Sequence, residues 1–269
     1  MTRPSLADRR GPVEERGVAR VAQHVDWRVV VDDRTFRWGY AAGHLIAEWP
    51  GILTLRATHG GNLMALEPAP GAPNVLVEKV RHGAAAAFLR AQSHRYSLHA
   101  SAVSRNGNAL VLLGDSGAGK STLADRLCRR GYDLLADDIA AIDLRPDGWH
   151  VLPSEANLWL DLDGSSSKTP SAAPLVATEP ALVEWVVLVG FDEAAPTLAL
   201  RDLRGADAAS ALFQSLVRFE RSPSVFEREL EVVSDLVIRT RVLEARRPHD
   251  VPADVVAEAL SALASQVGR

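Results

Sequence analysis

The chain has 269 residues, of which 47% are hydrophobic and 24% are charged. This length suits one large domain or two smaller ones, and the composition is typical of a globular protein. The formal net charge of -4 and the isoelectric point near 6.1 give no global field that would attract nucleic acid or an anionic membrane. We therefore expect neither nucleic acid nor a membrane as a partner.

Cysteine usage and hydropathy bear on the compartment in which the protein works. The single cysteine, Cys128, has no partner for an internal disulfide, and no CxxC or HExxH spacing occurs. Residues 1–30 contain no apolar signal-peptide segment. The longest apolar run, near Trp185–Phe191, is far shorter than the roughly 20 residues of a membrane span. These features favour a cytoplasmic location.

The N-terminal part of the chain predicts a tail followed by a small β-rich module. Residues 1–20 mix Arg, Glu, Pro and Gly without periodicity, which is typical of a flexible segment. Over residues 25–80, short apolar runs such as Trp27–Val31 and Gly51–Leu55 alternate with turn-forming residues. Short runs of this kind, bounded by Gly, Pro, Asn and Asp, are typical of β-strands.

A proline-rich stretch and an alanine-rich stretch follow the predicted strands. Glu67–Pro73 contains three prolines, which break regular structure, and Val80–Gln92 then favours a helix that leads into the next domain. We therefore expect three parts in the chain. These are a flexible tail over residues 1–20, a β-rich module over 21–92 and a second domain over 93–269.

The second domain opens with a predicted hairpin. Two apolar runs, Tyr96–Val103 and Ala109–Leu113, flank the dipeptide Asn106–Gly107. Asn-Gly is the strongest short-range hairpin signal, because both residues tolerate the positive φ angles of a type I′ turn. His99 would then lie on the strand beside the second strand of the hairpin.

A phosphate-binding motif follows the second strand of this hairpin. The pattern G-x-x-x-x-G-K-[ST] is matched in full by Gly114, Asp115, Ser116, Gly117, Ala118, Gly119, Lys120 and Ser121. Glycines let successive backbone N–H groups point at phosphate oxygens, and a following helix adds its positive N-terminal end. Lys120 would reach the β and γ phosphates of ATP, and Ser121 would hold Mg²⁺. Together with the next residue, Thr122, these residues form the predicted nucleotide site.

Acidic residues arrive soon after the motif. Lys120–Arg130 has helical spacing and is followed by Gly131, a favoured residue for a left-handed C-cap. The predicted strand Tyr132–Asp138 then ends in two acids, Asp137 and Asp138, which lie 17 and 18 residues after Lys120. Neighbouring strand residues face opposite sides, so one carboxylate could face a metal and the other an acceptor hydroxyl. A strand over Ile139–Leu144, a turn and a final helix ending near Val267 complete the prediction.

Three segments together resemble a known family. They are Ser97–Ser101, the glycine-rich motif Gly114–Ser121 and Arg130–Asp138. In order and spacing they resemble the catalytic domain of the HPr kinase/phosphorylase family. The resemblance is specific over about Ser97–Asp143 and does not cover residues 1–80. It implies an α/β fold with a P-loop kinase core of the HPr kinase C-terminal domain type, here joined to a β-rich N-terminal module.

The resemblance also implies roles for individual residues. Asp137 would act as the base toward a serine hydroxyl, Asp138 would support the metal ion with Ser121, and His99 would lie beside the reacting groups. Lys120 completes the implied catalytic set.

The sequence departs from the family pattern at one segment. Where the family has a glycine-rich segment associated with phosphorolysis, this chain reads Pro153–Leu160 without glycine. We therefore expect phosphorylation without the reverse reaction. A divergent branch of the family works in peptide-tailoring pathways and includes kinases that phosphorylate the C-terminal serine of lasso peptide precursors. This compact chain resembles that branch more than the sugar regulator.

The hypothesis from the sequence is an ATP- and Mg²⁺-dependent kinase that transfers the γ-phosphoryl group to a serine-type hydroxyl of a peptide or protein. The module over residues 21–92 would help to recognise that acceptor. Two alternatives stay open: a kinase for a small metabolite, and a regulatory module that binds nucleotide without transfer. A homo-oligomer is compatible with the sequence.

Overall fold

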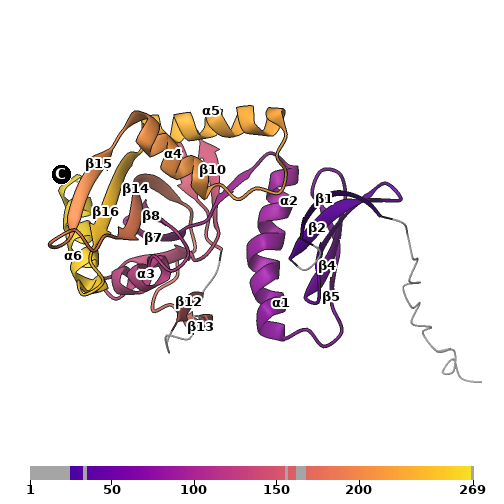
Figure 1. The fold of residues 1–269 in the computed structure, drawn as a ribbon, viewed down its shortest axis with the longest axis horizontal. Coiled ribbons are helices and arrows are strands. Elements are labelled where there is room, and N and C mark those ends of the chain that lie inside the picture. Colours follow the sequence, from indigo (N-terminus) through magenta and orange to yellow (C-terminus); the bar gives the residue numbers. More distant parts are fainter. Residues whose placement is uncertain (1–24, 33–34, 155–156, 162–167, 268–269) are drawn as a thin grey trace, which may run out of the picture.

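The computed structural model describes residues 25–32, 35–154, 157–161 and 168–267, and it has a mixed α/β fold (Figure 1). The predicted tail over residues 1–20 lies outside the described residues. An antiparallel sheet forms first, and its strands lie side by side in chain order. They are β1 (Asp26–Asp32), β2 (Phe36–Ala41), β3 (His44–Trp49), β4 (Leu53–Ala57) and β5 (Leu63–Pro68).

One long helical segment covers this sheet. It consists of α1 (Asn74–Val80), a π-helical turn η1 (Arg81–Ala85) and α2 (Ala86–Gln92), and it lies between the sheet and the rest of the chain (Figure 1). The helix therefore begins at Asn74 and not at Val80 as the sequence predicts. Its first turn contains β-branched residues of low helix propensity, but Val77 packs into the apolar core of the sheet and that burial outweighs the propensity.

An aromatic cluster joins this module to the second part of the chain. Phe36 and Phe88 pack with their ring centroids 5.7 Å apart in a T-shaped arrangement. Phe219, which comes from the far end of the sequence, packs against both, with centroid distances of 5.4 Å and 5.2 Å. The indole N–H of Trp38 also donates to the carbonyl oxygen of Phe219 at 2.8 Å. The core of the N-terminal module is thus completed by a residue of the C-terminal part.

The second part is built on a larger mixed sheet of nine strands among the described residues. The main path runs β6-β10-β11-β14-β8-β7-β9, and β16 pairs with both β14 and β15. The strands are β6 (Tyr96–Leu98), β7 (Ser101–Arg105), β8 (Asn108–Leu113), β9 (Asp133–Ala136), β10 (Ala140–Arg145), β11 (Gly148–Val151), β14 (Ala181–Phe191), β15 (Ala199–Leu203) and β16 (Arg241–Arg247). A separate hairpin is formed by β12 (Asn157–Asp161) and β13 (Lys168–Ala172).

The predicted hairpin is confirmed in this sheet. Strands β7 and β8 pair antiparallel, and Asn106 and Gly107 between them have φ angles of 55° and 80°. Strand β8 also pairs parallel with β14, which in turn pairs parallel with β16. Parallel strands place their carboxyl ends at one edge of the sheet, which is where ligands bind in open α/β sheets.

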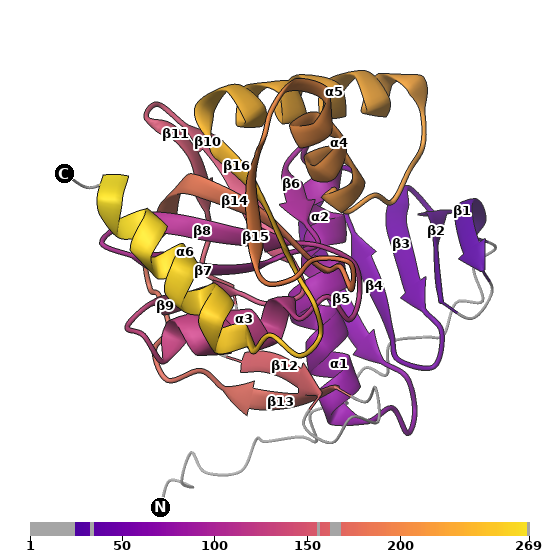
Figure 2. The ribbon, with the colours of Figure 1, turned by 60° about the vertical axis from the view of Figure 1, so that its left-hand side comes forward.

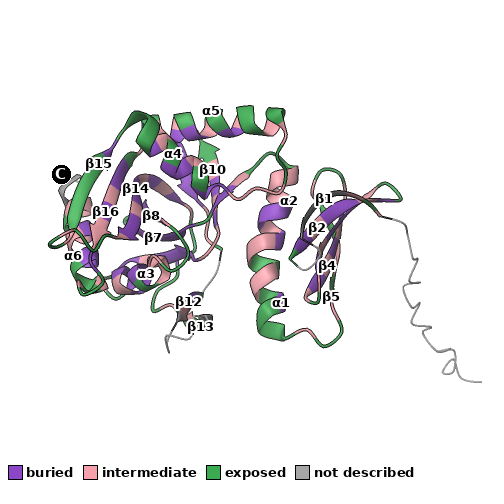
Figure 3. Ribbon diagram, in the orientation of Figure 1, coloured by how far each residue is buried: buried purple, intermediate pink, exposed green. Residues whose placement is uncertain are grey.

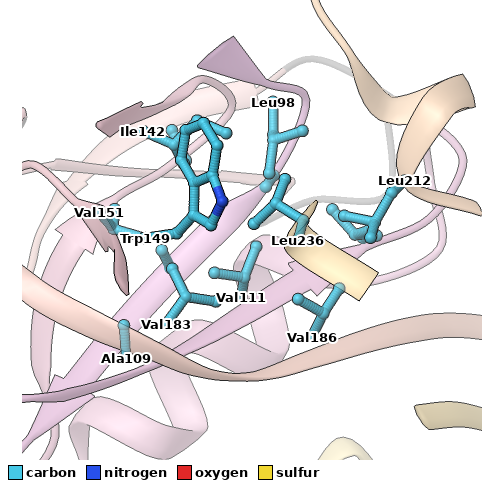
Figure 4. Packing of buried hydrophobic residues seen from close by; sticks show 14 of the residues in the cluster. Leu98, Ala109, Val111, Ile142, Trp149, Val151, Val183, Val186, Leu212 and Leu236 are labelled. Atoms are coloured by element: carbon cyan, nitrogen blue, oxygen red, sulfur yellow. The ribbon is translucent and has the colours of Figure 1, made fainter. Parts of the chain in front are cut away.

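Helices cover both faces of the large sheet (Figures 1 and 2). On one face, α3 (Lys120–Cys128) and α6 (Ala253–Val267) share an apolar core with the strands. On the other, α4 (Gly205–Ser215) and α5 (Pro223–Arg239) pack over residues such as Val111 and Trp149, with Leu212 and Leu236 pointing into the cluster (Figure 4). The inner strands are mostly buried, whereas β15 and the outer side of α5 are exposed (Figure 3).

No helix among the described residues is long and apolar enough to cross a bilayer.

Candidate active site

The glycine-rich motif forms a tight loop between β8 and α3. Gly114, Gly117 and Gly119 have φ angles of 141°, 86° and 88°, which side chains with a Cβ rarely adopt. At Gly114 a Cβ would also lie 2.3 Å from the carbonyl oxygen of Val189 on β14. The loop can therefore lie against the neighbouring strand only because this position is glycine.

The loop leads directly into an uncapped helix. Gly119 is the N-cap residue of α3, no side chain caps its first N–H groups, and no acidic residue occupies its first turn. Such an end carries unpaired N–H donors and the positive end of the helix dipole, which together favour an anion. The ammonium of Lys120 donates to the carbonyl oxygens of Gly114 and Asp115 at 2.7 Å and 3.0 Å, so it lies over the same loop.

Asp137 lies beneath this loop and is almost completely buried, with 1% of its surface exposed. The hydroxyls of Ser101 and Ser121 both donate to its Oδ1, the latter at 2.9 Å. The backbone N–H of Trp159 donates to its Oδ2 at 2.7 Å. Burial raises the pKa of Asp137, and the three hydrogen bonds oppose that rise. Because both oxygens are engaged and only 1% of its surface is exposed, this carboxylate is poorly placed to receive an acceptor hydroxyl.

Asp138 has the opposite environment. Its backbone has a φ of 73°, a left-handed conformation that turns the chain away from β9, and its side chain is 39% exposed. It lines a cavity of about 430 Å³ that also contains Lys120 and the start of the glycine-rich loop. Its Oδ2 lies 3.5 Å from the ammonium of Lys79 on α1. The aspartate pair therefore divides into a buried member next to Ser121 and a member that faces the cavity.

His99 also lines this cavity, but it does not lie on a strand as the sequence predicts. It occupies the bend between β6 and β7, where its backbone N–H donates to the carbonyl oxygen of Ser215 at 2.7 Å. The chain must turn here because β6 pairs with β10 whereas β7 pairs with β8 and β9. The bend leaves the His99 side chain exposed at the rim.

Several residues of the cavity carry no recognisable motif. Leu188 on β14 and Ala211, Gln214 and Ser215 on α4 complete its wall. They lie about 70 to 100 residues along the chain from the glycine-rich loop. Only the packing of α4 over the carboxyl end of β8 brings them there. Trp159, whose backbone N–H donates to Asp137, also has no motif signal, and Ser101 lies in the segment Ser97–Ser101, but the resemblance implies no role for it.

The donor set at the loop suits a nucleotide with Mg²⁺. The hydroxyl of Ser121 and the carboxylate of Asp137 are hard oxygen ligands of the kind that Mg²⁺ prefers, and they lie within hydrogen-bond distance of each other. The backbone curl over residues 114–119, Lys120 and the uncapped start of α3 offer donors to phosphate oxygens. Thr122 follows in the first turn of α3. A site for a nucleotide phosphate chain and a hydrated cation therefore fits the residues present.

Comparison with known proteins gives a distant likeness in fold. No protein-family model matches the sequence, and no curated protein matches it. The Hpr(Ser) kinase/phosphatase from Coxiella burnetii is similar in structure, with a TM-score of 0.41 and 12% sequence identity. The alignment covers 64% of this chain and 99% of that chain.

Proposed function

We propose that this protein is a kinase that binds ATP and Mg²⁺ at the glycine-rich loop and transfers the γ-phosphoryl group to a hydroxyl acceptor. One observation carries the proposal: Ser121 of the loop is hydrogen-bonded to the buried carboxylate of Asp137, while Asp138 presents a second carboxylate to the cavity that Gly114 and Lys120 also line. A protein that only binds nucleotide has no need for the second carboxylate. Phosphoryl transfer needs a group that can take the acceptor proton.

The geometry suggests a division of labour between the two aspartates. Ser121 would hold Mg²⁺, and Asp137 would accept the hydrogen of the Ser121 hydroxyl and so orient its oxygen toward the ion. The ion would neutralise charge on the β and γ phosphates. Asp138 would accept the proton of the acceptor hydroxyl as its oxygen bonds to the γ-phosphorus. The bond from that phosphorus to the bridging oxygen then breaks, and ADP leaves with the electron pair. Asp137 and Asp138 thus exchange the roles that the family resemblance implies.

Lys120 and His99 complete the proposed site. Lys120 would lie along the β and γ phosphates, where its charge stabilises the transferring group. The exposed side chain of His99 at the rim would contact either the γ-phosphate or the acceptor. Catalysis would depend on positioning and electrostatics, because no covalent enzyme intermediate is needed.

For the acceptor we propose a serine-type hydroxyl of a peptide or protein, as in an HPr-kinase-like enzyme. Support comes from the β-rich module, whose helix α1 reaches the reacting carboxylate through Lys79. The segment Pro153–Leu160 lacks glycine, so we propose transfer in the kinase direction only.

The experiment is incubation of the full chain with Mg²⁺ and ATP labelled on the γ-phosphate, together with peptide pools and small hydroxyl metabolites. Label transferred to a serine-containing peptide, located by mass spectrometry, supports the proposal. Label transferred only to a small metabolite would make the protein a metabolite kinase. ATP binding without any transfer or hydrolysis would leave it a nucleotide-binding module and overturn the proposed reaction.

A further inference from the structure

A lysine from the N-terminal module enters the candidate active site. Lys79 lies in the last turn of α1, and its ammonium lies 3.5 Å from Oδ2 of Asp138. The same ammonium lies 4.6 Å from the centroid of the Trp159 ring, within the range of a cation–π interaction. The Lys79 side chain is 29% exposed, so its ammonium lies between Asp138 and the Trp159 ring and is partly shielded from solvent.

Trp159 connects this lysine to the other aspartate. Its ring is buried, with 5% of the residue exposed, and its backbone N–H donates to Asp137 at 2.7 Å. One residue of β12 therefore contacts Asp137 through its main chain and reaches Asp138 through the lysine that lies on its ring. A change in the position of Trp159 would disturb both carboxylates together.

The contact is unsuited to a purely stabilising role. An ion pair between groups exposed to this extent contributes little to stability, because solvent screens it and both side chains lose conformational freedom. Its geometric effect is larger, because Asp138 itself has a left-handed backbone conformation outside any strand and its side chain is 39% exposed. The lysine engages Oδ2, which leaves Oδ1 to face an acceptor hydroxyl.

We propose that Lys79 is a positioning residue, which orients the carboxylate of Asp138 for proton transfer and couples the N-terminal module to the reaction. The inference rests on the proposed function for the role of Asp138. The N-terminal module is coupled to Lys79 because the helix that carries Lys79 packs on the module's sheet. Val77, two residues before Lys79, is buried in the core of the five-stranded sheet. Arg90, further along the same helix, donates to the carbonyl oxygen of Ile142 and to Asp143 on β10, at 2.8 Å and 2.9 Å. Movement of the module would therefore move Lys79 relative to Asp138.

The kinetic test compares three variants of the full chain. Lys79→Met removes the charge and keeps most of the side chain, Lys79→Arg keeps the charge, and Arg81→Met is the matched control. Arg81 lies on the same helical segment, but its guanidinium pairs with Glu78 at 3.7 Å, away from the aspartates. Hydrolysis of Mg-ATP can be followed without knowledge of the acceptor, with water in its place.

For Lys79→Met we expect kcat to fall about 10-fold to 100-fold, the usual effect of misplacing a reacting group, while KM for ATP stays within about twofold. Lys79→Arg should recover most of the rate, and Arg81→Met should match the wild type. Unchanged kcat in Lys79→Met would overturn the proposal. A rise in KM for ATP equal to the fall in kcat would overturn it too, because Lys79 would then bind nucleotide directly.

A second readout needs no nucleotide. The indole N–H resonance of Trp159, assigned with Trp159→Phe, should shift in Lys79→Met and remain in place in Arg81→Met. If it does not shift, Lys79 does not lie on the ring and the positioning role is wrong. If it shifts but the wild type neither binds nor hydrolyses ATP, the contact stands and the proposed kinase function fails instead.

Discussion

Lys120 is the residue at which nucleotide binding is most directly tested. Its ammonium lies over the glycine-rich loop and donates to two loop carbonyls. We expect Lys120→Ala to weaken ATP binding and to abolish transfer, because the β and γ phosphates lose the cation that the motif supplies. Isothermal titration calorimetry gives the affinity and circular dichroism gives the fold. A well-folded variant with normal turnover would remove the loop from the mechanism.

The two aspartates make a second prediction at this scale. Asp138→Asn should lower kcat by about two to four orders of magnitude, the usual contribution of a general base, with ATP affinity within a few-fold of wild type. Asp137→Asn should mainly raise the Mg²⁺ concentration needed for half-maximal rate. It should also lower stability, because the new amide places N–H donors opposite the donors that now bond Asp137. The reverse pattern in a Mg²⁺ titration of both variants would restore the roles that the family resemblance implies.

Cys128 offers a test of burial. Burial, with the nearby acids Asp125, Asp133 and Asp137, raises the pKa of this thiol to about 12. A raised thiol pKa means that the neutral form persists through the neutral pH range, and only the thiolate is strongly nucleophilic. We expect almost no reaction with iodoacetamide at pH 8 until denaturant unfolds the protein, when labelling should become rapid. Rapid labelling of the native protein would mean that α3 opens locally.

At the scale of elements, the sequence correctly predicted those features that depend on the backbone conformation of neighbouring residues. Asn106–Gly107 predicted the hairpin because the turn itself requires positive φ angles. Gly131 has the expected left-handed conformation, with a φ of 85°, but α3 ends at Cys128, two residues earlier than predicted. Two predictions were wrong: the helix begins at Asn74 and not at Val80, and His99 lies in a bend and not on a strand. Both depend on packing and pairing with distant segments, which local propensity does not contain.

Two glycines of the glycine-rich loop allow a prediction about stability, in which one substitution serves as the control for the other. Gly114→Ala would place a Cβ 2.3 Å from the Val189 carbonyl at a φ of 141°, whereas Gly117→Ala, at a φ of 86°, meets no atom within 4 Å. Gly117→Ala should lower the free energy of unfolding by only about 1–2 kcal/mol, because alanine must adopt the left-handed conformation. Gly114→Ala should lower the free energy of unfolding by more than this, because the loop must also move away from β14. Urea unfolding without nucleotide measures both, and equal losses would contradict the close contact seen at Gly114.

At the scale of the whole molecule, the sequence placed the loop and the two acids but not the residues around them. Lys79, Trp159 and Gln214 come from three separate parts of the chain, and only the tertiary fold brings them near the aspartate pair: Gln214 lines the cavity with Asp138, Lys79 pairs with Asp138, and Trp159 lies under Lys79. Each looks like an ordinary helix or strand residue in its own segment. A motif can be read from spacing because its residues act through local backbone geometry, whereas these residues act through contacts between elements.

The expected boundary between residues 92 and 93 raises the question of whether the module folds as a separate unit. Phe219 lies far beyond this boundary, yet its ring packs against Phe36 and Phe88 and its carbonyl accepts a hydrogen bond from Trp38. The helix that covers the module's sheet is bonded in turn to β10 by Arg90. Removal of the module would expose Phe219, because the rings that it packs against belong to the module. We therefore expect the two parts to unfold together.

The corresponding prediction concerns Phe219→Ala. Loss of the partly buried ring should cost about 2 kcal/mol, the usual effect of removing an apolar side chain of this burial. The loss should appear equally in tryptophan fluorescence, to which Trp38 and Trp49 of the module contribute, and in far-UV circular dichroism, because both would report one cooperative transition. A surface substitution on α5, Ile238→Ala, is the control, since that side chain is 82% exposed and should change stability little. If the wild type instead shows two separate transitions, and Phe219→Ala shifts only one of them, the module is an autonomous domain. Lys79 could then be withdrawn from Asp138 without unfolding the rest of the chain.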